Sequence, residues 1–134
     1  MKDELLLSMA EEARSLAYCP YSGMAVGAAL LTESGKVYLG ANIENASFTP
    51  TVCAERTAIF RALLDGEREF VKIAVSGGKA GVHVHASFPP CGVCRQVLAE
   101  FCSPELEVLL AGDEVKKYTL GELLPASFTK ENME

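Results

Sequence analysis

The sequence predicts an α/β fold in which a mixed sheet of about five strands carries helices on its faces. Apolar residues recur at every third or fourth position in some segments and form continuous runs in others, so helical and strand patterns alternate along the chain. The 134 residues contain no repeat, low-complexity tract or linker between these segments. Residues 1–134 are therefore expected to form a single domain with one core.

A helix and a β-hairpin are expected in the first third of the chain. Asp3 can cap a helix that begins at the following residues. The buried face of this helix would consist of apolar residues at helical spacing, namely Leu5, Leu6, Met9, Ala13, Leu16 and Ala17. Residues 25–32 and 37–41 are apolar runs separated by the turn-forming residues 33–36, which predicts two antiparallel strands in a buried sheet.

Two further helices are each expected to begin at a cysteine. Residues 53–65 show helical spacing, and Gly66 is a typical helix stop. The apolar contacts of this helix would come from Ala54, Ala58, Phe60, Leu63 and Leu64. Residues 91–101 show the same spacing, and Thr119 with Glu122 matches the capping box of a short terminal helix. The remaining strands are expected at residues 70–76, 107–111 and 115–118.

The charge and composition of the chain bear on its partners. Its 12 lysines and arginines against 18 aspartates and glutamates give a formal net charge of −6, so most of its surface would repel polyphosphate. Nucleic acid is therefore not expected as a partner. Hydrophobic residues make up 49% of the chain, which is high for a small domain, and part of this apolar surface is expected to lie in an oligomer interface.

Neither a membrane span nor a secreted disulfide framework is expected. No apolar run approaches the roughly 20 residues that cross a bilayer. The chain begins Met-Lys-Asp-Glu instead of a basic segment followed by an apolar core. The cysteines number 5, an odd count, and Cys91 and Cys94 are closely spaced. We therefore expect a cytoplasmic protein whose cysteines serve metal or redox chemistry.

Three cysteines and one glutamate form the most informative chemical pattern. Cys91 and Cys94 lie one helical turn apart, and Cys53 adds a third soft ligand, which together match a catalytic zinc site with one open coordination position. Glu55 follows Cys53 closely, and at about 100° per residue the two side chains would diverge inside a regular helix. Cys53 is therefore expected at the irregular first turn, with Glu55 beside the metal but not among its ligands.

This pattern predicts hydrolytic chemistry. Zinc would lower the pKa of its bound water, and Glu55 would take the proton from the water and return it to the substrate. The alternative is a structural zinc half-site or a thioredoxin-type redox pair at Cys91 and Cys94. That alternative leaves Cys53, Glu55 and Arg56 without a role.

A three-thiolate site requires positive charge nearby. Three thiolates on Zn²⁺ leave a net charge of −1, which disfavours the activation of water unless it is offset. The N-termini of two helices carry partial positive charge, and Arg56 and Arg95 each adjoin a candidate ligand in the sequence. A solvated surface position is the alternative for both arginines.

Further motifs extend across most of the chain. They are AYCPYS at 17–22, VGAAL at 26–30, GANIEN at 40–45, CAERTA at 53–58, PCGVCRQ at 90–96 and ELLP at 122–125. In order and spacing these motifs resemble the small homotetrameric cytidine deaminases, which are zinc-dependent nucleoside and base deaminases. The resemblance spans residues 17–128.

The resemblance implies a three-layer α/β/α sandwich and a reaction of pyrimidine salvage. In this reaction the exocyclic amine of cytidine or 2'-deoxycytidine is hydrolysed to give a uridine product and ammonia. The implied cofactor is zinc, held by Cys53, Cys91 and Cys94. Glu55 would be the catalytic proton shuttle, and Arg56 would hydrogen-bond a ligand sulfur. The implied assembly is a homotetramer whose subunits share active sites.

The resemblance also implies which residues contact the substrate. The backbone at Ala54 would bond the pyrimidine, and Asn42 and Glu44 would hold the ribose. Met24 would lie over the base, and Phe128 would reach the active site of a neighbouring subunit. The Glu44 carboxylate can accept hydrogen bonds from ribose hydroxyls and would repel a phosphate, which favours a small nucleoside over a nucleotide.

These assignments have plainer alternatives. Asn42 and Glu44 could merely cap a loop after a strand. Met24 could be core filler, and Phe128 could pack within its own chain. Another aminopyrimidine nucleoside, including a blasticidin-type antibiotic, is an alternative substrate, although the CAERTA motif with Asn42 and Glu44 favours cytidine.

Three features depart from the family pattern. Met24 stands where an aromatic residue is common, and Phe48 stands where a tyrosine is often found. Residues 77–87 form a longer segment than usual and contain His83 and His85, whose alternation would place both rings on one face of an extended segment. The two histidines could bind a metal or could lie in a solvated loop near the mouth of the site.

Overall fold

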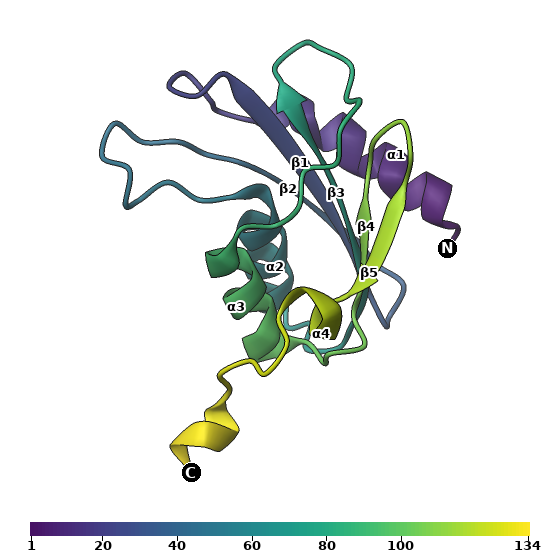
Figure 1. Cartoon of the computed structure of the whole chain (residues 1–134), viewed down its shortest axis with the longest axis vertical. Helices are drawn as coiled ribbons and strands as arrows, with labels where there is room; N and C mark the ends of the chain where they lie inside the picture. Colours follow the sequence, from purple (N-terminus) through teal and green to yellow (C-terminus); the bar gives the residue numbers. More distant parts are fainter.

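Five strands form one mixed sheet at the centre of the molecule (Figure 1). The computed structural model describes all residues, 1–134. The strands are β1 (Met24–Thr32), β2 (Val37–Ala41), β3 (Phe70–Lys79), β4 (Glu107–Leu110) and β5 (Lys116–Thr119). Their order across the sheet is β2-β1-β3-β4-β5. Strands β3 and β4 run parallel, and all other neighbouring strands run antiparallel.

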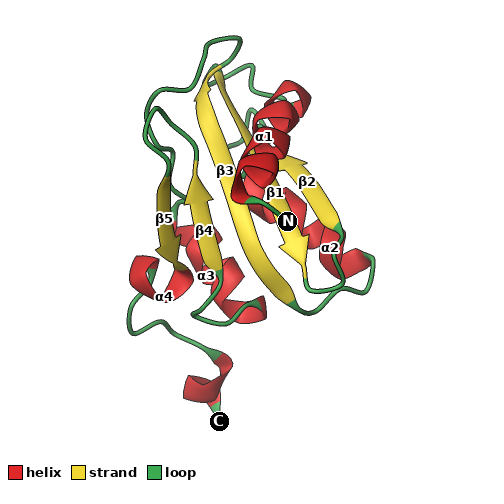
Figure 2. Cartoon of the chain, turned by 90° about the vertical axis from the view of Figure 1, so that its right-hand side faces the viewer, coloured by secondary structure: helices red, strands yellow, loops and turns green.

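Helices cover both faces of this sheet. They are α1 (Asp3–Ala13), α2 (Ala54–Leu64), α3 (Gly92–Phe101) and α4 (Leu120–Leu123), with short 3-10 helices at Arg14–Leu16 and Lys130–Met133. Helix α1 lies on one face, and α2 and α3 lie on the other (Figure 2). The predicted α/β/α sandwich with five strands is confirmed. None of the helices combines the length and the apolar character that crossing a bilayer requires.

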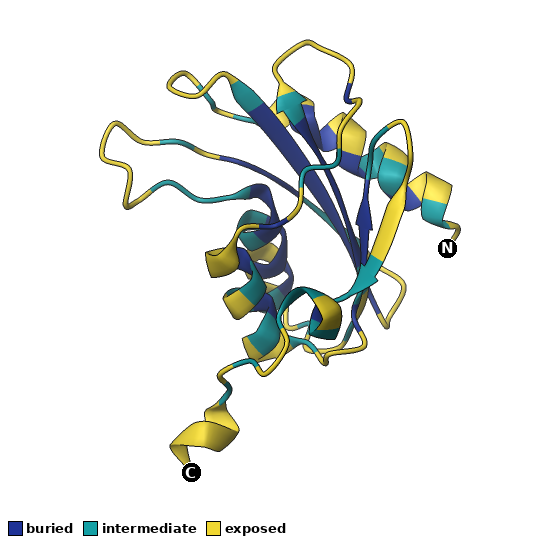
Figure 3. Cartoon of the chain, in the orientation of Figure 1, coloured by how far each residue is buried: buried dark blue, intermediate teal, exposed yellow.

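Alternate residues of β1 build the cores of both layers, because successive side chains of a strand point to opposite faces. Ala28 and Leu30 belong to the core on the α2 side, whereas Ala29 and Leu31 belong to the core on the α1 side. All four are buried, as is most of β1 (Figure 3). Burial on both faces explains why residues 25–32 form a continuous apolar run.

Close packing of α2 on β2 depends on Gly40. A Cβ atom at this position would lie 2.2 Å from the carbonyl oxygen of Ala54, so a larger residue would push the start of α2 away from the sheet. Thr57 supports the same contact, since its Oγ1 atom accepts a hydrogen bond from the Ala41 N–H at 3.0 Å. These contacts fix the first turn of α2 against the sheet.

The first helix differs from the prediction in its cap and its buried face. The N-cap residue of α1 is Lys2, and the Asp3 carboxylate instead accepts a hydrogen bond from Lys72 Nζ at 2.8 Å. Leu5 is exposed because it lies off the inward face of α1. Leu16 is exposed because the α-helix ends at Ala13, and the 3-10 turn that follows breaks the helical spacing. The buried residues of α1 are Leu6, Ala10 and Ala13.

The later elements match the predictions more closely. Strand β3 continues beyond residue 76 to Lys79, because it pairs with the whole length of β1, where Met24 lies opposite Lys79. The predicted capping box is present, since the Thr119 and Glu122 side chains each bond the other residue's backbone. Phe60 and Leu64 were predicted to pack, but they point outward from α2 and are 41% and 91% exposed.

Candidate metal centre and active site

Three cysteine side chains converge where α2 and α3 begin. Cys53 is the N-cap residue of α2, with an extended backbone (φ −76°, ψ 160°), and Cys91 is the N-cap residue of α3. Cys94 lies in the first turn of α3 and is buried. The Sγ atoms of Cys53 and Cys91 are 3.9 Å apart, and those of Cys91 and Cys94 are 3.5 Å apart. The prediction that Cys53 lies at the irregular start of its helix is confirmed.

The arrangement of the three thiols fits zinc. Tetrahedral sulfur ligands at a Zn–S distance of 2.3 Å lie about 3.8 Å from one another, close to the separations of these Sγ atoms. The ligand atoms of Cys53, Cys91 and Cys94 all lie within 4.8 Å of one another. The N-termini of α2 and α3 also favour thiolates at these positions. Zinc bound by three thiolates would keep its fourth coordination position open for water or substrate.

A guanidinium group lies against the thiols. The Arg56 Nη2 atom donates a hydrogen bond to Cys53 Sγ at 3.3 Å, and the Arg56 Nε atom is buried without a partner. Hydrogen bonds with Cys94 and Arg56 lower the pKa of Cys53 to about 5. The same bond with Cys53, together with burial, raises the pKa of Cys94. One thiolate therefore forms beside Arg56 even before a metal binds.

Arg95 has a different set of partners. Its Nε atom donates to the Pro90 carbonyl at 2.8 Å, and its Nη1 atom donates to the Leu123 carbonyl at 2.7 Å. These bonds link the segment before α3 to the end of α4. Of the two candidate arginines, Arg56 is thus the one that bonds a thiol.

Glu55 lies in the first turn of α2 and is only 3% exposed. Burial, with a further contribution from negative charge at Cys53, raises the pKa of Glu55 to about 7. A carboxyl group with a pKa near neutrality can accept and release a proton at physiological pH. Glu55 borders the same cavity as Cys53 and Cys91.

This cavity has a volume of about 260 Å³ and lies between the starts of the two helices and the start of β1. Four of the five residues predicted to bind substrate line it, namely Met24, Asn42, Glu44 and Ala54. Its walls are mainly apolar and carry a few polar groups, which is typical of a site for a small molecule. The fold therefore brings together residues that lie far apart in the sequence.

Asn42 is buried and tied to the backbone of β1. Its Oδ1 atom accepts a hydrogen bond from the Val26 N–H at 2.9 Å, and its Nδ2 atom donates to the Met24 carbonyl at 2.8 Å. These bonds fix the carboxamide at the cavity wall. One lone pair of Oδ1 is left for a ligand.

Glu44 is held by the segment before β1. Its Oε1 atom accepts hydrogen bonds from the backbone N–H groups of Tyr21 at 3.0 Å and Ser22 at 3.1 Å. The Ser22 hydroxyl donates to Oε2, and the bonds from Ser22 lower the pKa of Glu44. Glu44 is therefore an ionised carboxylate of fixed orientation beside the cavity.

Ser22 and Phe88 are among the cavity residues that the sequence did not assign to the site. Ser22 lies within the AYCPYS motif, so the motif was the signal for it. Phe88 lines the cavity and packs against β3, where a Cβ atom at Gly77 would lie 2.6 Å from its ring. Nothing in the local sequence identifies Phe88, because its position depends on the path of the long segment between β3 and α3.

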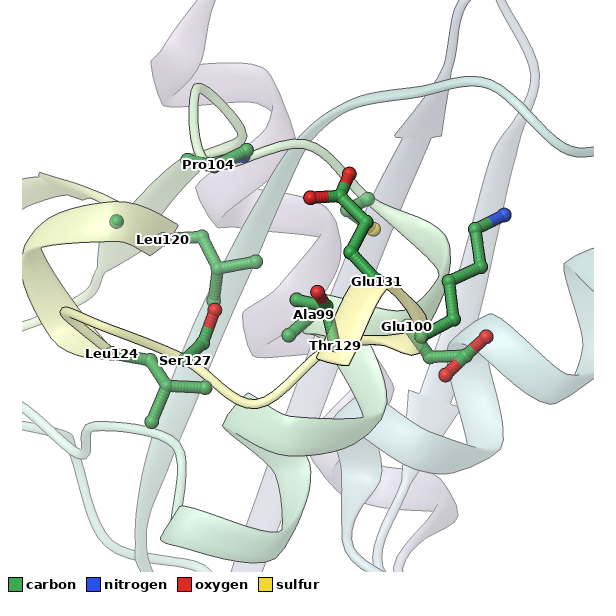
Figure 4. A pocket seen from close by; sticks show the side chains of 11 residues that line it. Ala99, Glu100, Pro104, Leu120, Leu124, Ser127, Thr129 and Glu131 are labelled. Atoms are coloured by element: carbon green, nitrogen blue, oxygen red, sulfur yellow. The ribbon is translucent and has the colours of Figure 1, made fainter. Parts of the chain in front are cut away.

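Phe128 and Phe48 are among the residues singled out from the sequence that lie outside this cavity. Phe128 is 59% exposed, and its backbone carbonyl accepts a hydrogen bond from Gln96 Nε2 at 2.8 Å. Phe48 is 81% exposed. A separate hollow lies between the end of α3, α4 and the C-terminal segment, and its lining includes Leu120 and Thr129 (Figure 4). No residue predicted to bind zinc or substrate lines that hollow.

The fold and the site together define a zinc enzyme of the α/β/α class. Residues 1–110 match the family model described as the cytidine and deoxycytidylate deaminase zinc-binding region, and the chain belongs to this family. Curated relatives match almost the whole chain. The cytidine deaminase of Sporosarcina psychrophila is 44% identical over 135 residues, which cover 99% of this chain and 96% of that protein.

Two further comparisons agree. The cytidine deaminase of Halalkalibacterium halodurans is 47% identical over 135 residues, which cover 99% of this chain and 98% of that protein. The crystal structure of the cytidine deaminase from Burkholderia pseudomallei superposes with a TM-score of 0.88 at 47% identity, covering 96% of this chain and all of that chain. The likeness therefore extends through the sheet and both helical layers.

Proposed function

We propose that this protein is a cytidine deaminase that hydrolyses cytidine and 2'-deoxycytidine to the corresponding uridines and ammonia, with residues 1–134 acting as one catalytic unit. The observation that carries the proposal is the buried carboxyl group of Glu55 beside three converging thiols, at the wall of a cavity. The near full-length relatives that are cytidine deaminases support it.

Cys53, Cys91 and Cys94 would hold the zinc ion in this enzyme. When bound, zinc lowers the pKa of a water molecule and so supplies a nucleophile at neutral pH. The Glu55 carboxylate accepts the two protons of the attacking water in turn, passing the first to the ring nitrogen and the second to the departing amine. The oxygen remains on C4, the C4–N bond breaks, and ammonia leaves. The near-neutral pKa of Glu55 suits both directions of proton transfer.

Substrate binding is assigned to the other residues of the cavity. The backbone of Ala54 would bond the pyrimidine, and Met24 would lie over the base. Asn42 and Glu44 would hold the ribose, because a fixed carboxylate and the free lone pair of a fixed amide oxygen suit two neighbouring hydroxyl groups. The negative charge of Glu44 disfavours a phosphate in the same place, which supports a nucleoside rather than a nucleotide.

A panel of amines tests this assignment. Ammonia release would be measured with cytidine, 2'-deoxycytidine, cytidine monophosphate, adenosine and blasticidin S. We expect turnover of the two cytidine nucleosides, at least tenfold lower kcat/KM for the monophosphate, and none for adenosine. Turnover of blasticidin S alone would show that the antibiotic, and not cytidine, is the substrate. A zinc-loaded protein that is inactive on the whole panel would refute the proposal.

The assembly we propose is a homotetramer whose active sites are completed by neighbouring subunits. Several large apolar side chains are exposed in the single chain, and contact with neighbouring subunits would remove them from water. The most exposed of these are Leu64 at 91%, Phe48 at 81% and Met133 at 76%. Light scattering on purified active protein should give four chains per particle, and a fully active monomer would contradict the assembly.

The cellular location we propose is the cytoplasm. All five cysteines are free thiols, and three of them form the proposed metal site. A reducing compartment keeps such thiols available for a metal.

A further inference from the structure

The two histidines of the chain lie in a second cluster of metal-binding groups, outside the active site. His83 and His85 belong to the segment between β3 and α3, and Asp113 belongs to the turn between β4 and β5 (Figure 1). The ligand atoms of these three residues all lie within 4.8 Å of one another. The two imidazole rings have centroids 4.7 Å apart.

The backbone holds this cluster in place. The Asp113 N–H donates a hydrogen bond to the His85 carbonyl at 2.8 Å, which joins the two segments. Val84, between the histidines, is only 6% exposed and anchors its segment in the protein. Because side chains alternate along an extended chain, burial of Val84 turns His83 and His85 outward on the same side.

The distances within the cluster suit a shared ion. The Nδ1 atom of His85 lies 3.0 Å from Oδ1 and 3.1 Å from Oδ2 of Asp113. Adjacent nitrogen and oxygen ligands at about 2.0–2.1 Å from one ion are separated by about 2.9–3.4 Å. All three side chains are exposed, so they can adjust to the ion, and water can complete its coordination.

We propose that His83, His85 and Asp113 form a second metal site that binds a divalent transition ion, with Zn²⁺ as the ion to test. The two imidazoles are borderline nitrogen ligands that favour such ions over Mg²⁺ or Ca²⁺, and a carboxylate is a common third ligand beside them. An ion at this site joins the β3–α3 segment to the β4–β5 turn. The same segment continues directly to Phe88 and Cys91, which line the cavity, so the second ion fixes the chain that leads into the active site.

Calorimetry on the zinc-loaded enzyme tests the proposal, because the first equivalent of zinc already occupies the thiols. Zn²⁺ is titrated into wild type, into a His83→Ala/His85→Ala double variant and into Asp113→Asn. Glu114→Gln is the matched control, since it removes the same charge from the neighbouring exposed residue. We expect one further equivalent in wild type and in the control, a Kd at least tenfold weaker in Asp113→Asn, and loss of that equivalent in the double variant.

Imidazole NMR signals give an independent readout. The chain has only 2 histidines, so every imidazole signal reports on this cluster. The second equivalent of Zn²⁺ should shift both sets of signals in wild type and in Glu114→Gln. The proposal is overturned if wild type binds no second equivalent, if the double variant binds it as tightly as wild type, or if the imidazole signals stay in place while it binds. Unchanged affinity in Asp113→Asn would also overturn the three-ligand site.

Discussion

The guanidinium group of Arg56 donates a hydrogen bond to the Sγ atom of Cys53 across 3.3 Å, within the first turn of α2. The two residues are three positions apart, a spacing that brings side chains to the same side of a helix. Three thiolates around one zinc ion carry a net charge of −1, and this bond withdraws negative charge from one of them. A less electron-rich sulfur leaves the bound ion a stronger Lewis acid.

Replacing this arginine should therefore impair catalysis more than metal binding. For Arg56→Gln we expect kcat on cytidine to fall by about 10–100-fold, with zinc still bound at one per chain at the thiols. Arg61→Gln is the control, because Arg61 lies on the same helix but donates to the Leu39 carbonyl at 2.7 Å. Metal analysis and steady-state kinetics measure both quantities. Wild-type kcat in Arg56→Gln would show that the bond does not tune the site.

Met24 lines the cavity at the start of β1, and a change there tests base recognition. A sulfur-to-ring contact contributes about 0.3–1.5 kcal/mol, and an aromatic pair contributes about 0.5–1.5 kcal/mol, so neither residue dominates binding. Met24→Phe should change KM for cytidine by less than about tenfold. The same change should raise KM for 5-methylcytidine relative to KM for cytidine, because a flat aromatic ring adjusts less than a flexible thioether to a substituent on the base. If both KM values stay constant while Tm shifts, Met24 belongs to the core.

Phe128 is exposed in the single chain and does not line the active-site cavity of that chain. If it completes a neighbouring active site, Phe128→Ala should raise KM for cytidine while leaving zinc content unchanged. Met133→Ala is the control, since Met133 is 76% exposed in the same C-terminal segment. An unchanged KM in Phe128→Ala would return this side chain to a packing role.

Glu11 links α1 to β3, and its carboxylate should make the stability of the protein depend on pH in the acid range. Burial alone would raise the pKa of Glu11, but hydrogen bonds from Ser76 and Arg14 outweigh it and lower the pKa below the usual 4.5. A lowered folded-state pKa stabilises the protein above pH 4.5, and this contribution is lost as pH falls through the folded-state value. Glu11→Gln should be less stable than wild type at pH 7, and the difference should shrink below pH 4.5.

Urea unfolding at a series of pH values measures this difference in the free energy of unfolding. Glu12→Gln is the matched control, because it removes an exposed carboxylate from the adjacent position of α1. A stability difference between Glu11→Gln and wild type that stays constant from pH 7 to pH 3 would contradict the stabilisation of the Glu11 carboxylate by Ser76 and Arg14.

Much of the fold could be predicted because a strand that is buried on both faces of a sheet appears in the sequence as a continuous apolar run. The run at residues 25–32 became β1, since its residues face either α1 or α2. Leu16 and Leu64 could not be placed correctly, because an apolar side chain in a sequence does not reveal whether it meets its own core or a surface for another chain. The prediction that Asp3 caps α1 was wrong, because the Asp3 carboxylate binds Lys72, which lies far away in the sequence.

The candidate site could be predicted where the chemistry is local. Cys53 and Glu55 must diverge in a regular helix, so placing Cys53 at the N-cap followed from helix geometry alone. Phe88 could not be found in this way, since its place in the cavity depends on how the segment after β3 folds back. The pairing of His85 with Asp113 was also hidden, because the two residues are 28 positions apart.

The kinetics of zinc-loaded Glu55→Gln test the central claim most directly. The amide keeps the shape of the side chain and lacks the carboxylate that moves the proton, so kcat on cytidine should fall by about 10²–10⁴-fold. Zinc content should remain at one per chain at the thiols, because Glu55 is not among the proposed ligands. A folded, zinc-loaded Glu55→Gln that deaminates cytidine at the wild-type rate would contradict the account.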